Sequence, residues 1–197
     1  MGEVETKVTK MPKKKIRLPL FIAVGITAIA AVVTAVILLS NSGGSGDDWL
    51  RKALAEDSVR TIELNEDIKA TEGYEVNGTK TIVGSGKISM TESSNFVFSV
   101  NDGAALTVDG ITLNVKNIGN NGVVVRAGGK LDWKSGTISY PKQYAIINYG
   151  EANIAGGTFE YAGTNWLYLK ANTKASITGG YFSSPAALVL KWRKVPH

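Results

Sequence analysis

Carboxylates are the side chains of this chain that could carry out acid–base chemistry. Cleavage of a glycosidic bond needs two carboxyl groups roughly 5 to 10 Å apart on a common face. The candidates for such a pair are Asp102, Asp109, Asp132 and Glu160. The repeat described below gives Asp132 a column of outward neighbours without a second carboxylate: Thr107, Asn153 and Ser176. The only histidine is the last residue. We therefore assign no catalytic residue, and the sequence favours a protein without enzymatic activity over a polysaccharide-cleaving enzyme.

Metal sites are the next class of chemistry to consider. The chain has no cysteine, which excludes disulfides, iron–sulfur clusters and zinc–thiolate sites. Acidic residues gather early in the repeats, at Glu63, Glu66, Asp67, Glu72 and Glu75. They lack the spacing of an EF-hand loop, so a solvated surface is favoured over a calcium site. We expect neither a metal ion nor a cofactor.

Aromatic side chains could bind a sugar, because sugars stack on aromatic rings. The candidates for an exposed, ligand-binding patch are Tyr144, Tyr149, Trp166 and Tyr168, which stand in or beside one strand type and its corners. A second pair, Tyr140 and Tyr161, is 21 residues apart. Counting alternate positions along the strand predicts that this pair points inward.

The charge of the chain is concentrated at its N-terminus. Residues 1–40 carry six basic and two acidic side chains, a net +4, whereas residues 41–197 carry sixteen basic and fifteen acidic ones. A nearly neutral body argues against a nucleic acid partner, which normally requires a basic face.

An apolar stretch follows the basic N-terminal residues. Leu18 to Leu39 contains no charged residue and would span roughly 33 Å as a helix, enough to cross a bilayer. The flanking basic residues are Lys13, Lys14, Lys15 and Arg17. The positive-inside rule keeps them in the cytoplasm. A cleavable signal peptide is the alternative, but its apolar region is normally only about 7 to 15 residues long.

These features predict a single-pass membrane protein. Residues 1–17 form a basic cytoplasmic tail, and residues 18–40 form a transmembrane helix that acts as an uncleaved signal anchor in the lipid bilayer. Residues 41–46 are a Gly- and Ser-rich linker. Residues 47–58 follow as a short amphipathic capping helix, with an apolar stripe that begins at Trp49 and Leu50.

The remaining chain repeats itself. The sequence EANIAGGTFEY at residues 151–161 returns as KASITGGYFSS at residues 174–184, an offset of 23 residues. Similar offsets extend two apolar columns upstream. The first column is Val83, Val108, Trp133, Ile154 and Ile177, and the second is Ile88, Leu113, Ile138, Phe159 and Phe182. Repeats of 20 to 50 residues are typical of solenoids.

Each repeat is predicted to contain three short strands, because apolar and polar residues alternate around both columns. The third strand of each repeat is predicted at residues 96–98, 123–125, 145–147, 166–169 and 187–190. Corners rich in Gly and Asn follow nearly every one. Stacking of equivalent strands builds three parallel sheets around one apolar core.

This pattern resembles the right-handed parallel β-helix, the pectate-lyase-like fold of many bacterial cell-surface proteins. Residues 61–89 look like the usual first coil of such domains, and the resemblance covers about residues 58–190. It implies an all-β solenoid of about five coils within residues 59–197. Enzymes of this family cleave acidic polysaccharides. Its lyases use acidic residues on neighbouring coils to hold calcium, and its hydrolases use clustered aspartates.

We therefore expect a membrane-anchored, extracytoplasmic β-helix on a bacterial cell surface, acting as a binding or structural module. The expected ligand is a glycan, a carbohydrate-binding role that rests on the fold. One alternative is a polysaccharide lyase or hydrolase, and another is a scaffold that stacks end to end. Self-association would use the C-terminal coil, unless Trp192 folds across it.

Overall fold

The computed structural model describes residues 46–115, 121–160, 163, 165–170 and 172–183, together with the backbone of residues 36–37. The predicted cytoplasmic tail lies outside these residues, as do its membrane-flanking Lys13, Lys14, Lys15 and Arg17. The predicted third strand at residues 187–190, Trp192, Tyr161 and His197 also lie outside them.

The predicted membrane span overlaps the described residues at only two positions. Val36–Ile37 form strand β1, which pairs in parallel with β2 (Thr61–Glu63) through Val36↔Thr61 and Ile37↔Ile62. At these two positions the backbone is a strand and not part of a helix. Both residues are β-branched and suit the free edge of a sheet. Within the described part of the chain, no helix has the length and apolarity needed to cross a bilayer.

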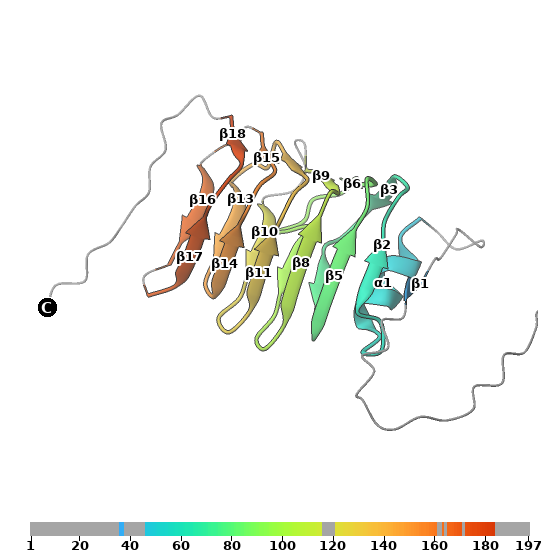
Figure 1. The fold of residues 1–197 in the computed structure, drawn as a ribbon. Helices are drawn as coiled ribbons and strands as arrows, with labels where there is room; N and C mark the ends of the chain where they lie inside the picture. The colour runs from blue at the N-terminus through green and yellow to red at the C-terminus, as the bar shows by residue number, and fades with distance from the viewer. Residues whose placement is uncertain are drawn as a thin grey trace, which may run out of the picture. The chain divides into compact units, whose positions relative to one another are not determined.

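Three parallel sheets form the domain (Figure 1). We call them sheets A, B and C. In the described residues, sheet A has the order β1, β2, β5 (Thr79–Val83), β8 (Ala105–Asp109), β11 (Lys130–Trp133), β14 (Glu151–Ile154) and β17 (Lys174–Ile177). Sheet B has the order β3 (Ile68–Ala70), β6 (Lys87–Met90), β9 (Thr112–Asn114), β12 (Thr137–Ser139), β15 (Thr158–Phe159) and β18 (Tyr181–Phe182). Sheet C has the order β4 (Tyr74–Val76), β7 (Phe98–Val100), β10 (Asn121–Val125), β13 (Tyr144–Asn148) and β16 (Asn165–Leu169).

The chain visits sheets A, B and C in turn, and each strand pairs with the equivalent strands one coil before and after it. The result is a parallel β-solenoid of about five coils, which confirms the all-β solenoid part of the predicted fold class. Figure 1 shows the strands of sheet A side by side in chain order from β2 to β17. Strand pairing of this kind repeats every 4.8 Å or so along the stack.

The register confirms the second predicted column and corrects the first. Ile88, Leu113 and Phe159 stand in one column of sheet B, as predicted. In sheet A, however, Val108 pairs with Ile82 and not with Val83, which pairs with Asp109 and lies on the outward side. The sequence offset of 25 residues is thus one residue short at this coil.

The repeated Gly-Gly pair has a structural cause at the corner between sheets A and B. One glycine with positive φ occupies this corner in five successive coils: Gly84, Gly110, Gly136, Gly157 and Gly180. The corner conformation itself disfavours a side chain. Space is also missing, since a Cβ at Gly157 would lie 2.6 Å from Nε1 of the buried Trp133.

A short helix covers the N-terminal end of the solenoid. Helix α1 (Asp48–Ala55) lies within the predicted capping segment and buries Leu50, Ala53 and Leu54. Its last carbonyls are bound by Lys80, an inward-facing residue of β5. Lys80 Nζ donates to the backbone oxygens of Ala53 (3.2 Å), Glu56 (2.5 Å) and Val59 (2.8 Å).

Burial makes this lysine unusual. Lys80 is only 1% exposed. Its burial lowers the pKa of its ammonium group below the ordinary value, and the nearby carboxylates of Asp57 and Glu56 oppose that shift. Three carbonyl acceptors match the three donors of an ammonium group, so Lys80 joins the last turn of α1 to the segment that follows it.

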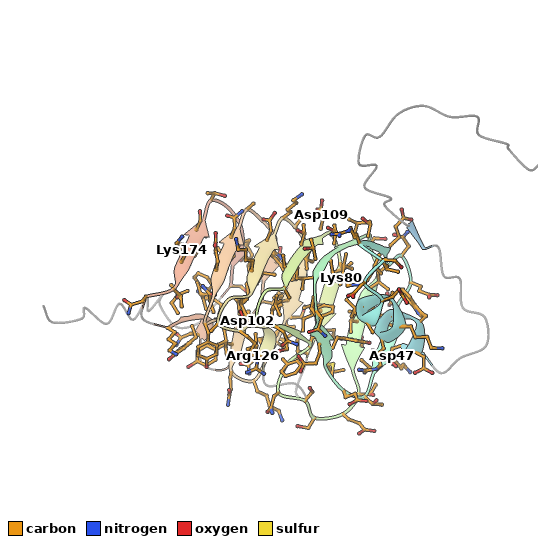
Figure 2. All side chains as sticks on the ribbon, turned by 90° about the horizontal axis from the view of Figure 1, so that it is seen from below. Asp47, Lys80, Asp102, Asp109, Arg126 and Lys174 are labelled. Carbon is orange, nitrogen blue, oxygen red and sulfur yellow. The ribbon has the colours of Figure 1, made fainter. Side chains whose placement is uncertain are left out.

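A second polar cluster fastens the start of α1 to the first coil. The Tyr74 hydroxyl donates to Asp47 Oδ2 at 2.8 Å, and Arg51 forms a 2.8 Å ion pair with the same oxygen. The Arg51 guanidinium also donates to the carbonyls of Glu72 and Gly73 and stacks over the Tyr74 ring, 4.5 Å from its centroid. Figure 2 labels Asp47 and Lys80 at the end of the solenoid that α1 covers.

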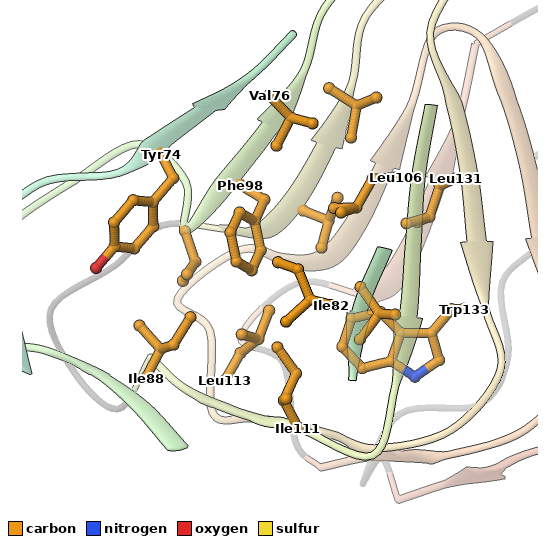
Figure 3. Close-up of a cluster of buried hydrophobic side chains, with 14 of the residues drawn as sticks. Tyr74, Val76, Ile82, Ile88, Phe98, Leu106, Ile111, Leu113, Leu131 and Trp133 are labelled. Atoms are coloured by element: carbon orange, nitrogen blue, oxygen red, sulfur yellow. The ribbon is translucent and has the colours of Figure 1, made fainter. Parts of the chain in front are cut away.

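One apolar core runs through the coils. Side chains from all three sheets point into it, as Figure 3 shows for Ile82 of sheet A, Leu113 of sheet B and Phe98 of sheet C. At the last described coil this burial ends. Ile177 is 40% exposed, although it stands in register with the fully buried Ile154, and every residue of β17 is exposed. The C-terminal end of the described solenoid is therefore open.

Candidate functional site

The outward face of sheet C is the surface where apolar and aromatic side chains gather. Its central column is Ser99, Val124, Ile147 and Tyr168, which pair in that order across β7, β10, β13 and β16. Val124 and Ile147 do not belong to the interior core cluster, yet they are almost completely buried. They are therefore outward positions of sheet C that are shielded from solvent.

Three tyrosines supply cover beside Ile147. The Tyr144 and Tyr168 ring centroids are 5.5 Å apart at an interplanar angle of 59°, and those of Tyr149 and Tyr168 are 6.0 Å apart at 56°. Tyr144 and Tyr149 flank the outward Ile147 in the chain and are half-buried, while Tyr168 is 39% exposed. We call Tyr144, Tyr149 and Tyr168 the tyrosine cluster.

A lysine lies at the edge of this cluster. Lys170 Nζ is 5.8 Å from the centroid of the Tyr149 ring, a cation–π distance. Lys170 follows β16 directly and is exposed. The cluster thus combines partly exposed aromatic faces, phenolic hydroxyls and one positive charge. Such a surface can stack on an apolar ligand face and donate hydrogen bonds at its rim.

The fourth predicted residue of the patch, Trp166, is not at the surface. Trp166 is 7% exposed, and its ring centroid lies 4.0 Å from that of Phe182. The prediction that it contributes to an exposed patch is therefore wrong. The register places Gly122, Ala145 and Trp166 at one inward level, so the side chain grows larger toward the end of the stack and fills the interior.

Tyr140 was also placed incorrectly by the alternation of the strand. It is 43% exposed, with φ of 52°, and therefore does not point into the core. A left-handed backbone at this position turns the side chain away from the direction that the strand pattern implies. The equivalent residues Met90 and Val115 of earlier coils are buried, as predicted.

The candidate acid–base carboxylates lie on different elements, and two of them accept hydrogen bonds from neutral side chains. Asp132 Oδ1 accepts a hydrogen bond from Asn153 Nδ2 at 3.0 Å, and Asp109 Oδ1 accepts one from Ser135 Oγ at 2.5 Å. Asp102 lies in the corner after β7, and Glu160 follows β15 of sheet B. In the described residues, no three His, Asp or Glu side chains gather as a metal site would require.

The acidic residues of the first coil are similarly dispersed. Asp67 forms an exposed 2.5 Å ion pair with Lys87 of the next coil. Glu66 and Glu72 are exposed in the turns beside β3, and Glu75 is exposed on β4. These positions match the solvated surface that the sequence favoured for this stretch.

Comparison with known proteins adds no relative. No protein-family model, no curated protein and no solved structure matches the chain. The strand order and register described above therefore carry the assignment to the β-solenoid class.

The polar groups that close the N-terminal end were missed by sequence reasoning. A signal for Lys80 was present: in the strand TKTIV at residues 79–83, it alternates with Thr79 and Thr81 on the same side as the buried Ile82. A lysine at an inward position indicates buried acceptors. The pattern does not reveal that these acceptors are the carbonyls at the end of α1.

Proposed function

We propose that this protein is a membrane-anchored, extracytoplasmic β-solenoid of a bacterial cell surface that binds a glycan through its tyrosine cluster. The observation that carries the proposal is the contact of Tyr144 and Tyr149 with the exposed Tyr168 on the outside of sheet C. The residues come from two adjacent coils, so the parallel stacking is what brings them together.

The cluster has the physical properties of a sugar-binding surface. A pyranose presents C–H groups on its faces and hydroxyls around its rim. Tyrosine rings bury the former at a small cost in side-chain entropy, and phenolic hydroxyls bond the latter. The cluster is open on the outside of a rigid sheet, which suits a long chain that passes across it better than a small enclosed ligand.

A glycan array with the full-length chain in detergent micelles tests this function. Wild type should bind a subset of glycans, and Tyr168→Ala should lower the signal at least tenfold. Tyr181→Ala is the matched control, because Tyr181 is an exposed tyrosine on sheet B. Equal signals for wild type and Tyr168→Ala would refute the proposal.

Membrane display rests on the basic residues Lys13, Lys14, Lys15 and Arg17 before the apolar stretch that begins at Leu18. Protease added to intact cells should remove the solenoid and leave a tag at Met1 intact. Digestion of that tag, with the solenoid protected, would reverse the proposed orientation.

Self-association through the C-terminal coil is a second candidate function. The exposed Ile177 at the open end favours it. Since α1 covers the opposite end, two such ends would meet each other and form a closed pair instead of a filament. Light scattering across a concentration series distinguishes a pair from a monomer.

A further inference from the structure

The solenoid is polarised in charge along its axis. Among the described residues, those up to 102 carry six basic and eleven acidic side chains, a net −5, whereas those from 103 to 183 carry six basic and four acidic ones, a net +2. No Asp or Glu follows Glu160 in the sequence. The net charge of residues 41–197 is only +1, so the total charge does not show this separation. The tyrosine cluster lies in the positive half.

Two cations border the tyrosine cluster in one row. The register of Val125 with Asn148, and of Asn148 with Leu169, continues through Arg126, Tyr149 and Lys170. Backbone hydrogen bonds extend the ladder, since Tyr149 N donates to Val125 O and Lys170 N donates to Asn148 O. One coil separates each member from the next, so the Cα atoms of Arg126 and Lys170 are about 10 Å apart.

These cations are available to a ligand. Both side chains are exposed, and none of the ion pairs among the described residues involves Arg126 or Lys170. Arg126 Nε donates to Ser99 Oγ at 3.1 Å, and its guanidinium lies 5.7 Å from the Phe96 ring centroid. Figure 2 labels Asp102 near Arg126, but the two form no ion pair.

We infer that the glycan bound by the tyrosine cluster is a polyanion that carries sulfate or phosphate ester groups. This inference rests on the proposed function and adds the chemical class of its ligand. Sugar rings stack on Tyr149 and Tyr168, while two ester groups along the chain accept hydrogen bonds from Arg126 and Lys170. The sugar rings and the anionic groups of the ligand thus both find partners on the outward face of sheet C. Charge-assisted hydrogen bonds of this kind are stronger than those between neutral groups.

Dextran and dextran sulfate provide matched probes, because they share one glucose backbone and differ in charge. Titration of the full-length chain in detergent should show binding of dextran sulfate at least tenfold tighter than that of dextran. Lys170→Gln and Arg126→Gln should each weaken binding of dextran sulfate about tenfold, the value of one charge-assisted bond. Lys69→Gln is the control, since Lys69 is exposed on the first coil of sheet B. Thermal unfolding checks that each variant is folded.

The outcomes separate the inference from the function on which it rests. If neutral glycans bind in a Tyr168-dependent way while Lys170→Gln and Arg126→Gln change nothing, the polyanion is wrong and the glycan site stands. If Tyr168→Ala affects no glycan, both are wrong. If a single-stranded oligonucleotide binds through Arg126 and Lys170 and dextran sulfate does not, the ligand is a nucleic acid and the inference is overturned. Dextran sulfate binding that needs Tyr168, Arg126 and Lys170 together supports it.

Discussion

The two ends of the solenoid differ in how deeply they bury the same apolar column of sheet A. At the N-terminal end Ile62 is buried, and β1 pairs with its strand on the next level, whereas Ile177 at the last described coil is 40% exposed. Both are isoleucines at equivalent positions of sheet A, connected through Ile82, Val108, Trp133 and Ile154. Burial in a solenoid thus depends on what lies on the next level, and not on the residue type.

The ends also differ in how they use polar groups. Near α1 the polar groups stabilise the fold. Lys80 binds backbone carbonyls at and after the end of α1, and Asp47 binds both Arg51 and Tyr74. In the last coils, Lys170 and the tyrosine cluster face the outside of sheet C. The polar groups of the N-terminal coils thus stabilise the fold, and the proposed binding surface lies on the C-terminal coils.

The largest expected effect comes from one charge placed at three levels of this column. Ile62→Asp and Ile154→Asp bury an unpaired carboxylate, which costs several kcal/mol, and we expect loss of cooperative unfolding in urea. Ile177→Asp should lower the free energy of unfolding by about 1 kcal/mol or less. If Ile177→Asp proves as damaging as Ile154→Asp, the C-terminal end is covered in solution and the contrast between the ends disappears.

Removal of the buried lysine should have the next largest effect. Lys80→Met keeps much of the apolar volume but leaves the carbonyls of Ala53, Glu56 and Val59 without their donor. We expect a loss of about 3 kcal/mol in the free energy of unfolding. Lys87→Met, which breaks an exposed ion pair, should cost about 0.5 kcal/mol or less. Similar urea midpoints for both variants would show that Lys80 does not hold the cap.

The Tyr74 hydroxyl should give a pH-dependent contribution. Burial and its hydrogen bond to Asp47 raise the pKa of Tyr74 above its ordinary value of 10. Above pH 10 the unfolded chain releases this proton while the folded chain keeps it, so wild-type stability falls by about 1.4 kcal/mol per pH unit from this group. Tyr74→Phe should cost about 1 to 2 kcal/mol at pH 7.5.

The advantage of wild type over Tyr74→Phe should therefore shrink as the pH rises above 10. Urea unfolding of both proteins between pH 7.5 and pH 11 measures this difference directly. A constant difference across that range would mean that Tyr74 titrates normally and that the cluster beneath α1 is open to water.

The smallest effect is expected on the outward face of sheet A. Asp132→Asn keeps an oxygen that can accept the hydrogen bond from Asn153. The free energy of unfolding should stay within about 0.5 kcal/mol of wild type, as is usual for surface changes. A larger loss in urea would show that the charge of Asp132, and not only its shape, stabilises the ladder.

The sequence by itself determined the class of fold. Two columns of apolar residues recurred at the same offsets over five repeats, which predicted a solenoid. The alternation around them predicted strands, because burial on one side of a strand has a period of two residues. From this pattern came the second column through Ile88 and Phe159, while the apolar stripe from Trp49 and Leu50 predicted the helix near Asp47. The same counting failed at Val83, where one coil is a residue longer and only the pairing of Ile82 with Val108 shows the register.

The tertiary structure alone decided which aromatic and charged groups meet. Sequence reasoning chose four aromatic candidates, and stacking brought Tyr144, Tyr149 and Tyr168 together while it turned Trp166 into the core. Likewise, the acceptors of Lys80 and the row of Arg126 and Lys170 come from segments more than 20 residues apart. Local alternation predicts whether a side chain faces inward or outward on its own strand. Its contacts, however, come from the coils before and after it, and the lengths of those coils vary independently.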